Sequence, residues 1–547
     1  MNIINFRLIR KIFSLLTLII FLFSACKDDF LETYPEDSLS EAIFWRDKKD
    51  ATNALTGCYY YATPAWTRGL TGWNTYNLLF DLMTDIARTK FPPGNYGLGI
   101  HRNLQTNWWA ASVWTYNYQR IASFNYFLEN IEKVDMDPTE KAEMIAEVRF
   151  LRSYSYFWLS QLHGNVPLVT EVLTFNEANS VSQALKKDVI NFALDELKQA
   201  AIDLPIKRPS SEKGRVEKGT ALAIRGRLLM ADNQWSEAAQ TYKQIMDLNR
   251  YSIDPRFKKL FEDEGDDSDE IIFAVQQLED HRGESMTQKV TPPSWFGGNN
   301  HTTIFQEFVD KFLMMDGKTI EESPLYDPEN PFENRDPRLY ATVWLPDYSY
   351  NEAQGKIFRG HPDSLTMIGQ TGPGLTGYAP RKFYDEDYKG DVWNYGSDFI
   401  LVRYAEVLLS YLESILEAGD GITQSLLDNT INKVRGRQEI NMPPVTETNP
   451  DKLREIIRRE RVVEFGLEGL RYWDLRRWGI ALEVIAQDFH GMKLTDNPEE
   501  YDGKYIINDK GHLFSCTRDY YEYNDLWAIP QGELDINKNL VQNPGYN

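Results

Sequence analysis

The feature that most constrains the fold of this 547-residue chain is the spacing of its apolar residues. In many segments they recur at steps of three and four, which places them on one face of an α-helix. Helices are predicted over Ser40–Tyr61, Trp114–Ile131, Thr139–Leu162, Val181–Ile202, Gly219–Ala231, Ser236–Leu248, Phe399–Ala418, Ser425–Arg437, Asp451–Phe465 and Tyr472–Ile485. Because such helices must bury their apolar faces against one another, the fold is predicted to be mainly α.

The two helices predicted between residues 219 and 248 indicate how this packing is achieved. Leu222 and Gly226 on the first helix, with Ala238 and Tyr242 on the second, match the tetratricopeptide pattern. In that pattern small residues let two antiparallel helices approach closely, and the neighbouring helices fit the same architecture loosely. We therefore expect a tetratricopeptide-like helical-repeat scaffold, which is typical of binding or docking proteins.

The region from Tyr251 to Asp398 differs from the helical scaffold. Short β-like runs, Glu270–Val275 and Tyr340–Trp344, stand among loops rich in Gly, Pro and Asn. We expect an irregular, loop-rich subdomain with few short strands here. The tail from Asn524 to Asn547 has little periodicity and is predicted to pack as an extended strap.

The N-terminus has the pattern of a targeting signal. Arg7, Arg10 and Lys11 precede the uncharged stretch Ile12–Ala25, which is shorter than the ~20 residues that a membrane-spanning helix needs. Small residues then directly precede Cys26, as in a bacterial lipobox, so residues 1–25 are predicted to be a lipoprotein signal peptide and Cys26 its lipidation site. The alternative is an ordinary secretory peptide cut near Ala25.

Charge and cysteine content exclude other classes. The net charge of −22 makes nucleic-acid binding unfavourable, because an acidic surface repels phosphate backbones. Beyond Cys26 only Cys58 and Cys516 remain, so at most one disulfide can form, and the sequence leaves open whether it does.

The sequence offers little catalytic chemistry. No His pair has the spacing of a zinc-binding helix and no nucleophile elbow is present, so neither a metal nor a cofactor is predicted. Asp81 and Asp85 are four residues apart and could share a helix face as paired glycosidase carboxylates do, but nothing else supports hydrolysis. The chain is predicted not to be an enzyme.

Motifs along most of the chain, in their order, resemble those of the SusD/RagB family. They lie at Asp29–Glu32, Glu41–Trp45, Glu147–Tyr156, Leu162–Val169, Arg403–Leu409, Ile431–Arg435, Glu460–Gly479, Leu526–Gln531 and Gln542–Tyr546. The charged residues between 459 and 477 are predicted to be ion-pair struts between helices: Arg459, Glu460, Arg461, Glu464, Arg471, Asp474, Arg476 and Arg477. The resemblance implies an N-terminal region (26–250) and a C-terminal region (251–547) packed as one globular unit.

The resemblance also implies a function. Proteins of this family bind oligosaccharides or polysaccharides at the cell surface and deliver them to a SusC-like TonB-dependent transporter of the outer membrane. This chain would be anchored there by acyl chains, including palmitate, on Cys26. Two alternatives stay open: a peptide-binding, RagB-like nutrient-uptake lipoprotein, and a helical-repeat adaptor that docks proteins without a small ligand.

Candidate ligand residues come from aromatic side chains in loops, because 14 Trp and 30 Tyr suggest a surface that binds by stacking. The first region runs from Trp66 to Trp109 and the second from Trp295 to Tyr378. The predicted carbohydrate-binding residues are Trp66, Trp73, Asn74, Asp85, Trp108, Trp295, Phe296 and Tyr378, and Arg88 lies in the first region as well. Trp108 and Trp109 are adjacent and diverge by ~100° on a helix, so at most one of them can face a ligand.

Overall fold

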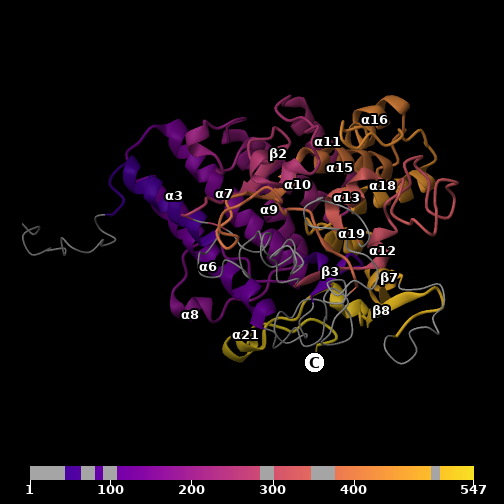
Figure 1. Ribbon diagram of the computed structural model, residues 1–547. Coiled ribbons are helices and arrows are strands. Elements are labelled where there is room, and N and C mark those ends of the chain that lie inside the picture. Colours follow the sequence, from indigo (N-terminus) through magenta and orange to yellow (C-terminus); the bar gives the residue numbers. More distant parts are fainter. Residues whose placement is uncertain are drawn as a thin grey trace, which may run out of the picture.

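The computed structural model describes residues 44–62, 80–89, 108–281, 283, 301–345, 376–493 and 506–546 (Figure 1). It is mainly helical, with a few short strands in small sheets, which confirms the predicted fold class. The helices are α3 (Lys48–Ala62), α6 (Trp108–Asn130), α7 (Pro138–His163), α8 (Phe175–Ala178), α9 (Lys186–Asp203), α10 (Lys218–Ala231), α11 (Trp235–Asp247), α12 (Gln306–Val309), α13 (Pro337–Thr342), α15 (Tyr404–Glu417), α16 (Gln424–Asn429), α17 (Ile431–Arg435), α18 (Pro450–Phe465), α19 (Arg471–Arg477), α20 (Ala481–Ile485) and α21 (Gln531–Ile536).

The strands of the described residues form four antiparallel pairs. These are β1 (Ala87–Thr89) with β3 (Thr302–Ile304), β2 (Ile271–Val275) with β6 (Phe399–Arg403), β4 (Val343–Trp344) with β5 (Ala379–Pro380), and β7 (Asp488–Lys493) with β8 (His512–Thr517). No helix of these residues is long and apolar enough to cross a bilayer. Cys58 and Cys516 are both free thiols.

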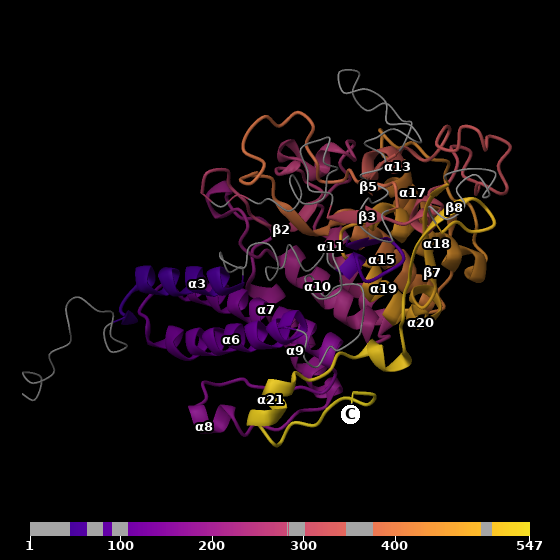
Figure 2. The ribbon, with the colours of Figure 1, turned by 60° about the horizontal axis from the view of Figure 1, so that its bottom comes forward.

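The N-terminal helices α3, α6, α7 and α9 lie side by side (Figure 2). The central helix α7 begins at Asp137, whose carboxylate accepts hydrogen bonds from the amides of Thr139 and Glu140, with Pro138 in the first helical position. It ends at Gly164, which has a φ of 74° that favours glycine. These end signals fix the register of a helix whose second half is buried throughout.

The α10–α11 pair contains the close helix crossing that the tetratricopeptide pattern predicts. A Cβ on Gly226 would lie 2.5 Å from Cζ of the Tyr242 ring, so the two helices meet where only a hydrogen fits. Tyr242 is buried in the main hydrophobic cluster, which includes residues of both the N-terminal and C-terminal regions, for example Leu151 and Leu408.

Several predicted boundaries were wrong. The helix predicted from Phe399 begins at Tyr404, because Phe399–Arg403 is strand β6 and is buried along its whole length. A continuous apolar run does not distinguish a buried strand from a buried helix. The helices predicted over Ser425–Arg437 and Tyr472–Ile485 are each divided in two, at Thr430 and at Trp478–Ile480.

Three further differences concern short elements. The β-like run Tyr340–Trp344 is strand only at Val343 and Trp344, because α13 extends to Thr342. The β7–β8 hairpin was not predicted, and the predicted strap contains α21.

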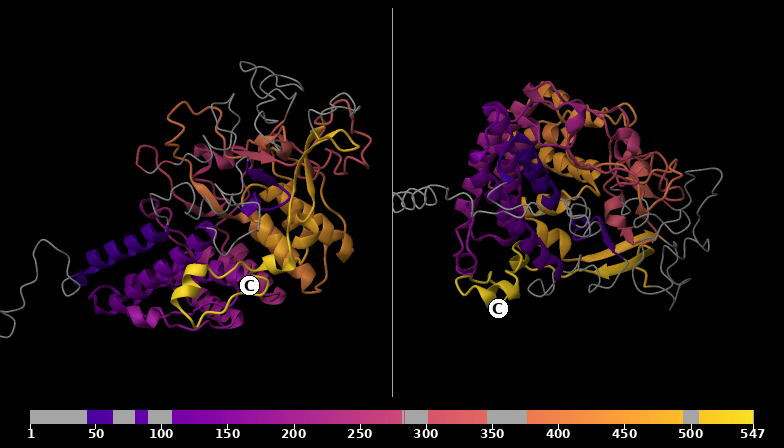
Figure 3. Two further views of the ribbon diagram at one scale, coloured as in Figure 1. Left: turned by 90° about the horizontal axis from the view of Figure 1, so that it is seen from below. Right: turned by 90° about the vertical axis from the view of Figure 1, so that its left-hand side faces the viewer.

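The C-terminal segment packs against the N-terminal helices (Figure 3). The buried Trp527 donates its amide to the Leu162 carbonyl at 2.6 Å. The side chain of Asn543 donates to the carbonyls of His163 and Trp527 at 2.9 and 2.7 Å. Nδ1 of His163 lies 3.1 Å from the Ala528 carbonyl, and burial lowers the pKa of His163 to about 4.

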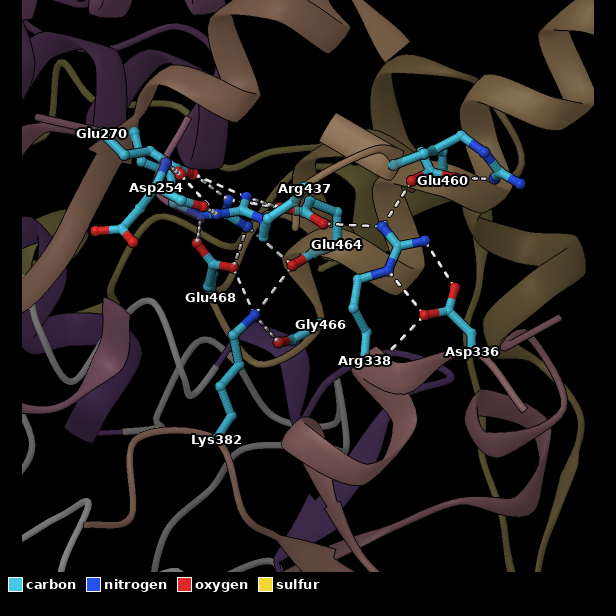
Figure 4. A network of polar contacts seen from close by, with 12 residues as sticks. Asp254, Glu270, Asp336, Arg338, Lys382, Arg437, Glu460, Glu464, Gly466 and Glu468 are labelled. Carbon is cyan, nitrogen blue, oxygen red and sulfur yellow. Dashed lines mark hydrogen bonds and ion pairs between the residues drawn. The ribbon is translucent and has the colours of Figure 1, made fainter. Parts of the chain in front are cut away.

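A buried network of charges joins the C-terminal elements (Figure 4). Its cations are Arg338, Lys382, Arg403, Arg435 and Arg437, and its anions are Glu270, Asp336, Glu460, Glu464 and Glu468. At its centre Glu464 on α18 accepts from Arg338, Arg403 and Arg437 at 2.7 to 2.9 Å. Burial acts to raise the pKa of Glu464, but Arg403 and the other guanidiniums overcome it and hold that pKa far below its ordinary value.

The predicted struts are confirmed at α18 and α19, where Arg461 contacts Asp474 through two hydrogen bonds of 2.7 and 2.9 Å. Other members of the predicted set find partners elsewhere: Arg471 pairs with Asp85, and Glu464 lies in the central network. In each case a fully buried charge is paired, as burial of charge requires. Arg476 donates to backbone carbonyls instead, and among the described residues no carboxylate pairs with it or with Arg459.

Replacing Glu464 with Gln should destabilise the protein by about 3–5 kcal/mol, because three buried guanidiniums would lose their shared carboxylate. Urea unfolding monitored by circular dichroism measures the loss. The control Glu264→Gln removes an exposed carboxylate 3.3 Å from Lys259 and should change stability by less than about 1 kcal/mol. Equal effects of the two variants would contradict the central role of Glu464.

At the α10–α11 crossing, Gly226→Ala should destabilise by about 1–3 kcal/mol, because the added methyl overlaps the Tyr242 ring. The matched change Gly57→Ala on α3 meets nothing within 4 Å and should stabilise by about 0.5–1 kcal/mol through helix propensity. Thermal unfolding of both variants tests this difference in sign. A smaller side chain at Tyr242, as in Tyr242→Leu, should lessen the cost of Gly226→Ala.

Candidate functional site

Each of the two predicted ligand regions contains one strand of the β1–β3 pair. In that pair Thr89 lies opposite Thr302. Residues 90–107 of the first region follow Thr89 directly, and residues 295–300 of the second region come shortly before Thr302. Parts of the two regions therefore lie side by side, although Thr89 and Thr302 are more than two hundred residues apart in sequence.

Thr376, the first described residue after residues 346–375, contacts both β3 and β7. The amide of Thr376 donates to Oγ1 of Thr303 at 3.1 Å, and its carbonyl accepts from the amide of Met492 on β7 at 2.7 Å. Residues 494–505 belong to the connection between β7 and β8 and follow Lys493, the last residue of β7. We call β1, β3, residues 376–378 and the β7–β8 hairpin the loop platform.

Close backbone contacts hold the loop platform together. A Cβ on Gly491 would lie 2.5 Å from the carbonyl oxygen of Thr376, so the two backbones touch where no side chain fits. Gly377 has a φ of 80°, and a Cβ there would meet Sδ of Met492 at 2.3 Å. Arg88 on β1 adds a bond of 3.0 Å to the carbonyl of Ser515 on β8. These contacts stabilise the base that residues 90–107 and 494–505 follow in sequence and that residues 284–300 and 346–375 precede.

Asp85, which precedes β1 in the sequence, forms a buried ion pair. Both of its carboxylate oxygens accept from Arg471 of α19 at 2.8 Å. Burial acts to raise the pKa of Asp85, but the Arg471 guanidinium overcomes it and the pKa lies below its ordinary value. Such a pair fastens the segment before β1 to the helical scaffold.

Asp81 has a different environment from Asp85. It is fully buried, its Oδ2 accepts from the amide of Gly469 at 2.8 Å, and burial raises its pKa to about 8. The two carboxylates thus bind different partners inside the protein, and neither is available to water as a hydrolytic pair would be.

Tyr378 is also part of the base. Only 2% of its surface is exposed, and its hydroxyl donates to Oε1 of Gln306 at 2.6 Å. Its carbonyl accepts from the amide of Ile304, which ties residues 376–378 to β3. Asp85 and Tyr378 therefore contribute to the positioning of the loops in this structure.

The other predicted ligand residues are not tested by the structure. Trp66, Trp73, Asn74, Trp295 and Phe296, and the predicted lipidation site Cys26, lie outside the described residues. Trp108 begins α6, and its side chain also lies outside the described part. These assignments stay predictions.

Sequence reasoning missed Arg518, which holds the segment before β1. Its buried guanidinium donates to the carbonyls of Leu82 and Ala87 at 2.7 Å, and also to that of Thr84. Its Cζ lies 4.9 and 5.3 Å from the ring centroids of Phe305 and Phe489, two rings that stack on each other. No local sequence pattern marks this role, because all its partners are distant along the chain.

Trp393 was missed as well, although the signal that selected Trp73 and Trp295 applies to it: a Trp beside Asn and Gly in a loop. It is 56% exposed. Its loop is fastened to the segment that precedes the second region, because Asn394 donates to Asp280 at 2.8 Å and Tyr388 to Glu279 at 2.6 Å. An exposed indole therefore stands where residues 284–300 leave the described scaffold.

Among the described residues no group of three or more His, Cys, Asp or Glu side chains is arranged to hold a metal ion.

Comparison with known proteins gives consistent matches. The profile of the SusD family matches residues 269–546, and a profile described as "Starch-binding associating with outer membrane" matches residues 29–230. A crystal structure of a SusD-like carbohydrate-binding protein from Bacteroides fragilis is 32% identical, with a TM-score of 0.80 over 91% of this chain and 100% of that chain. A laminarin-binding SusD-like protein is 22% identical, with a TM-score of 0.68 over 92% and 100% of the two chains, and shares the fold.

Relatives found by sequence agree. The starch-binding protein SusD of Bacteroides thetaiotaomicron is 24% identical over 466 residues, which cover 78% of this chain and 76% of that protein. SusD-like protein P25 of Formosa agariphila is 23% identical over 89% of this chain and 93% of its own.

Replacing Asp85 with Asn should leave Arg471 buried without a counterion and destabilise the protein by about 3–5 kcal/mol. Amide hydrogen exchange should accelerate most in residues 80–89, because Asp85 fastens that segment. Asp269→Asn is the control, since Asp269 is 62% exposed and pairs with Arg250 at the surface. Unchanged exchange of residues 80–89 in Asp85→Asn would contradict the anchoring role.

Proposed function

Because this chain belongs to the SusD family, we propose that it is a cell-surface lipoprotein that binds oligosaccharides or polysaccharides and delivers them to a SusC-like TonB-dependent transporter of the outer membrane. The carbohydrate-binding relative from Bacteroides fragilis and the starch-binding relative from Bacteroides thetaiotaomicron support glycan as the ligand class. The profile named for starch binding in association with the outer membrane supports the location.

The observation that carries the proposal is that the loop platform brings together described residues next to four undescribed chain segments. Residues 90–107 and 284–300, which contain or adjoin the predicted ligand residues, connect to β1 and β3. A glycan site needs aromatic faces for the sugar rings and polar groups for the hydroxyls, all in fixed relative positions. A base stiffened by Asp85–Arg471 and by Arg518 supplies fixed positions at low entropic cost on binding.

Trp393 extends this site. Its exposed indole lies beside the chain that leads to Trp295 and Phe296, and we include it among the residues that stack on sugar. We keep Trp73, Trp295 and the neighbouring predicted residues Trp66, Asn74, Trp108 and Phe296 as ligand contacts. Asp85 and Tyr378 are buried and act as positioning residues for the loops.

The anchor follows from the N-terminus. Acyl chains on Cys26 would hold the folded domain at the membrane, each buried methylene contributing ~0.8 kcal/mol. Residues 27–43 would link the anchor to α3. A tethered binding protein raises the local concentration of glycan at its transporter, which favours delivery.

Trp393→Ala should weaken glycan binding by about 1 kcal/mol, roughly fivefold, through the loss of a stacking face. Trp73→Ala and Trp295→Ala are expected to do the same. Affinity electrophoresis of each variant in gels that contain starch, laminarin or other polysaccharides measures the effect. The control is Phe175→Ala, because Phe175 on α8 is 81% exposed and distant in sequence from the loops.

Normal mobility of all three Trp variants on every glycan that retards the parent protein would refute the assigned positions. Retardation by no glycan, together with saturable binding of peptides, would favour the RagB-like alternative. Thermal unfolding confirms that each variant is folded.

A further inference from the structure

A cavity with a volume of about 300 Å³ lies in the helical scaffold. Side chains of α7, α10, α15 and α19 line it, and Lys186 of α9 and Leu526 of the C-terminal strap stand at its edge. The elements that form it meet near the middle of Figure 2. None of its described lining residues belongs to the loop platform, so it is separate from the proposed glycan site.

The lining of this cavity is cationic in a strongly acidic protein. Its positively charged residues are Lys186, Arg227, Arg461, Arg476 and Arg477, and its negatively charged residues are Glu406, Asp474 and Asp525. Arg227 is paired with Glu406, and Arg461 with Asp474. Among the described residues neither Lys186 nor Arg476 has a carboxylate within ion-pair distance.

Two residues that line the cavity carry buried donors without a partner. Gln161 is only 6% exposed, and its Nε2 has no hydrogen-bond partner in the described part of the chain. Arg476 donates to the backbone carbonyls of Gln161 and Asp525, while its buried Nε has no partner there. These two nitrogens have almost no accessible surface, but buried donors without acceptors are costly, so an acceptor oxygen that reached them would be favoured.

Lys186 is a desolvated cation. Burial, together with the positive charge of Arg476, lowers its pKa to about 8, against the raising effect of Asp232 and Asp525. Lys186 and Arg476 line the same cavity, where their positive charges repel one another. A single negative group between them would relieve both the repulsion and the desolvation.

One wall of the cavity is aromatic. The ring of Trp473 lies 5.6 Å from that of Phe157 and 5.4 Å from that of Trp158 between centroids, and Arg476 stands over Trp473 at 5.7 Å. Flat apolar surface next to unpaired donors suits a molecule with a ring at one end and an acidic group at the other.

We propose that this cavity binds a small organic anion, a carboxylate carried on a six-membered ring, with the carboxylate at Lys186, Arg476 and Gln161 and the ring against Trp473. Its volume is at the lower end of ligand pockets and fits one ring rather than a chain. The same chemistry is offered by an acidic sugar and by an aromatic acid. The site does not depend on the proposed glycan-binding function of the loop platform.

Isothermal titration of the full chain with D-glucuronate and with benzoate tests the proposal. At least one should bind, and its neutral counterpart, D-glucose or benzamide, should bind at least tenfold more weakly. Lys186→Met should weaken binding of the acid at least tenfold. Lys187→Met is the matched control, because Lys187 pairs with Asp232 outside the cavity lining, and it should leave the affinity unchanged.

Preference for glucuronate or for benzoate identifies the source of the carboxylate. Binding of acetate or sulfate as tight as that of the ring acids would mean an adventitious ion only and would overturn the proposal, as would no binding by either acid or an equal effect of Lys187→Met. If Lys186→Met does not fold, Gln161→Leu provides the second variant and should also weaken the acid. Trp393→Ala should leave this binding intact, which separates the test from that of the glycan site.

Discussion

The structure depends on the sharing of buried carboxylates by several guanidiniums. Glu464 alone would be an intolerable charge in the interior, yet Arg338, Arg403 and Arg437 converge on it from three separate parts of the chain. Because the ion pairs of the network join as many anions as cations, its interior is neutral while every partner is fixed in direction. Apolar packing alone would leave these elements free to slide, whereas paired hydrogen bonds between charges allow one arrangement.

Buried charged groups also stabilise the loop platform, which contains little regular secondary structure. β1 and β3 are three residues each, too short to be stable by themselves. Arg518 satisfies backbone carbonyls that a larger sheet would have paired, and Asp85 ties the approach to β1 to α19. Specificity can then vary in the loops while the base keeps its geometry, which is how loops on a rigid scaffold commonly carry binding sites.

The sequence predicted the helices well, whereas most of the predicted ligand residues lie outside the described part of the chain and stay predictions. Helical periodicity and end signals such as Asp137-Pro138 are local, so α7 and α18 begin and end near the predicted positions. Strand β6 escaped prediction because a fully buried strand has no alternation. Asp85 was selected for its charge, but its burial against Arg471 depends on a partner nearly four hundred residues away, which no local pattern reveals. Trp393 could have been found, since its Asn- and Gly-rich setting matches that of the chosen Trp residues.

The position of the C-terminal strap has a consequence for how the protein is made. Trp527 and Asn543 close the end of α7, so the interior of the N-terminal helices is completed by residues from the last twentieth of the chain. During synthesis the growing polypeptide cannot complete these contacts until residues 527–543 have emerged. Completion of the native core is thereby delayed, and a chain that lacked these residues would present an open core to proteases.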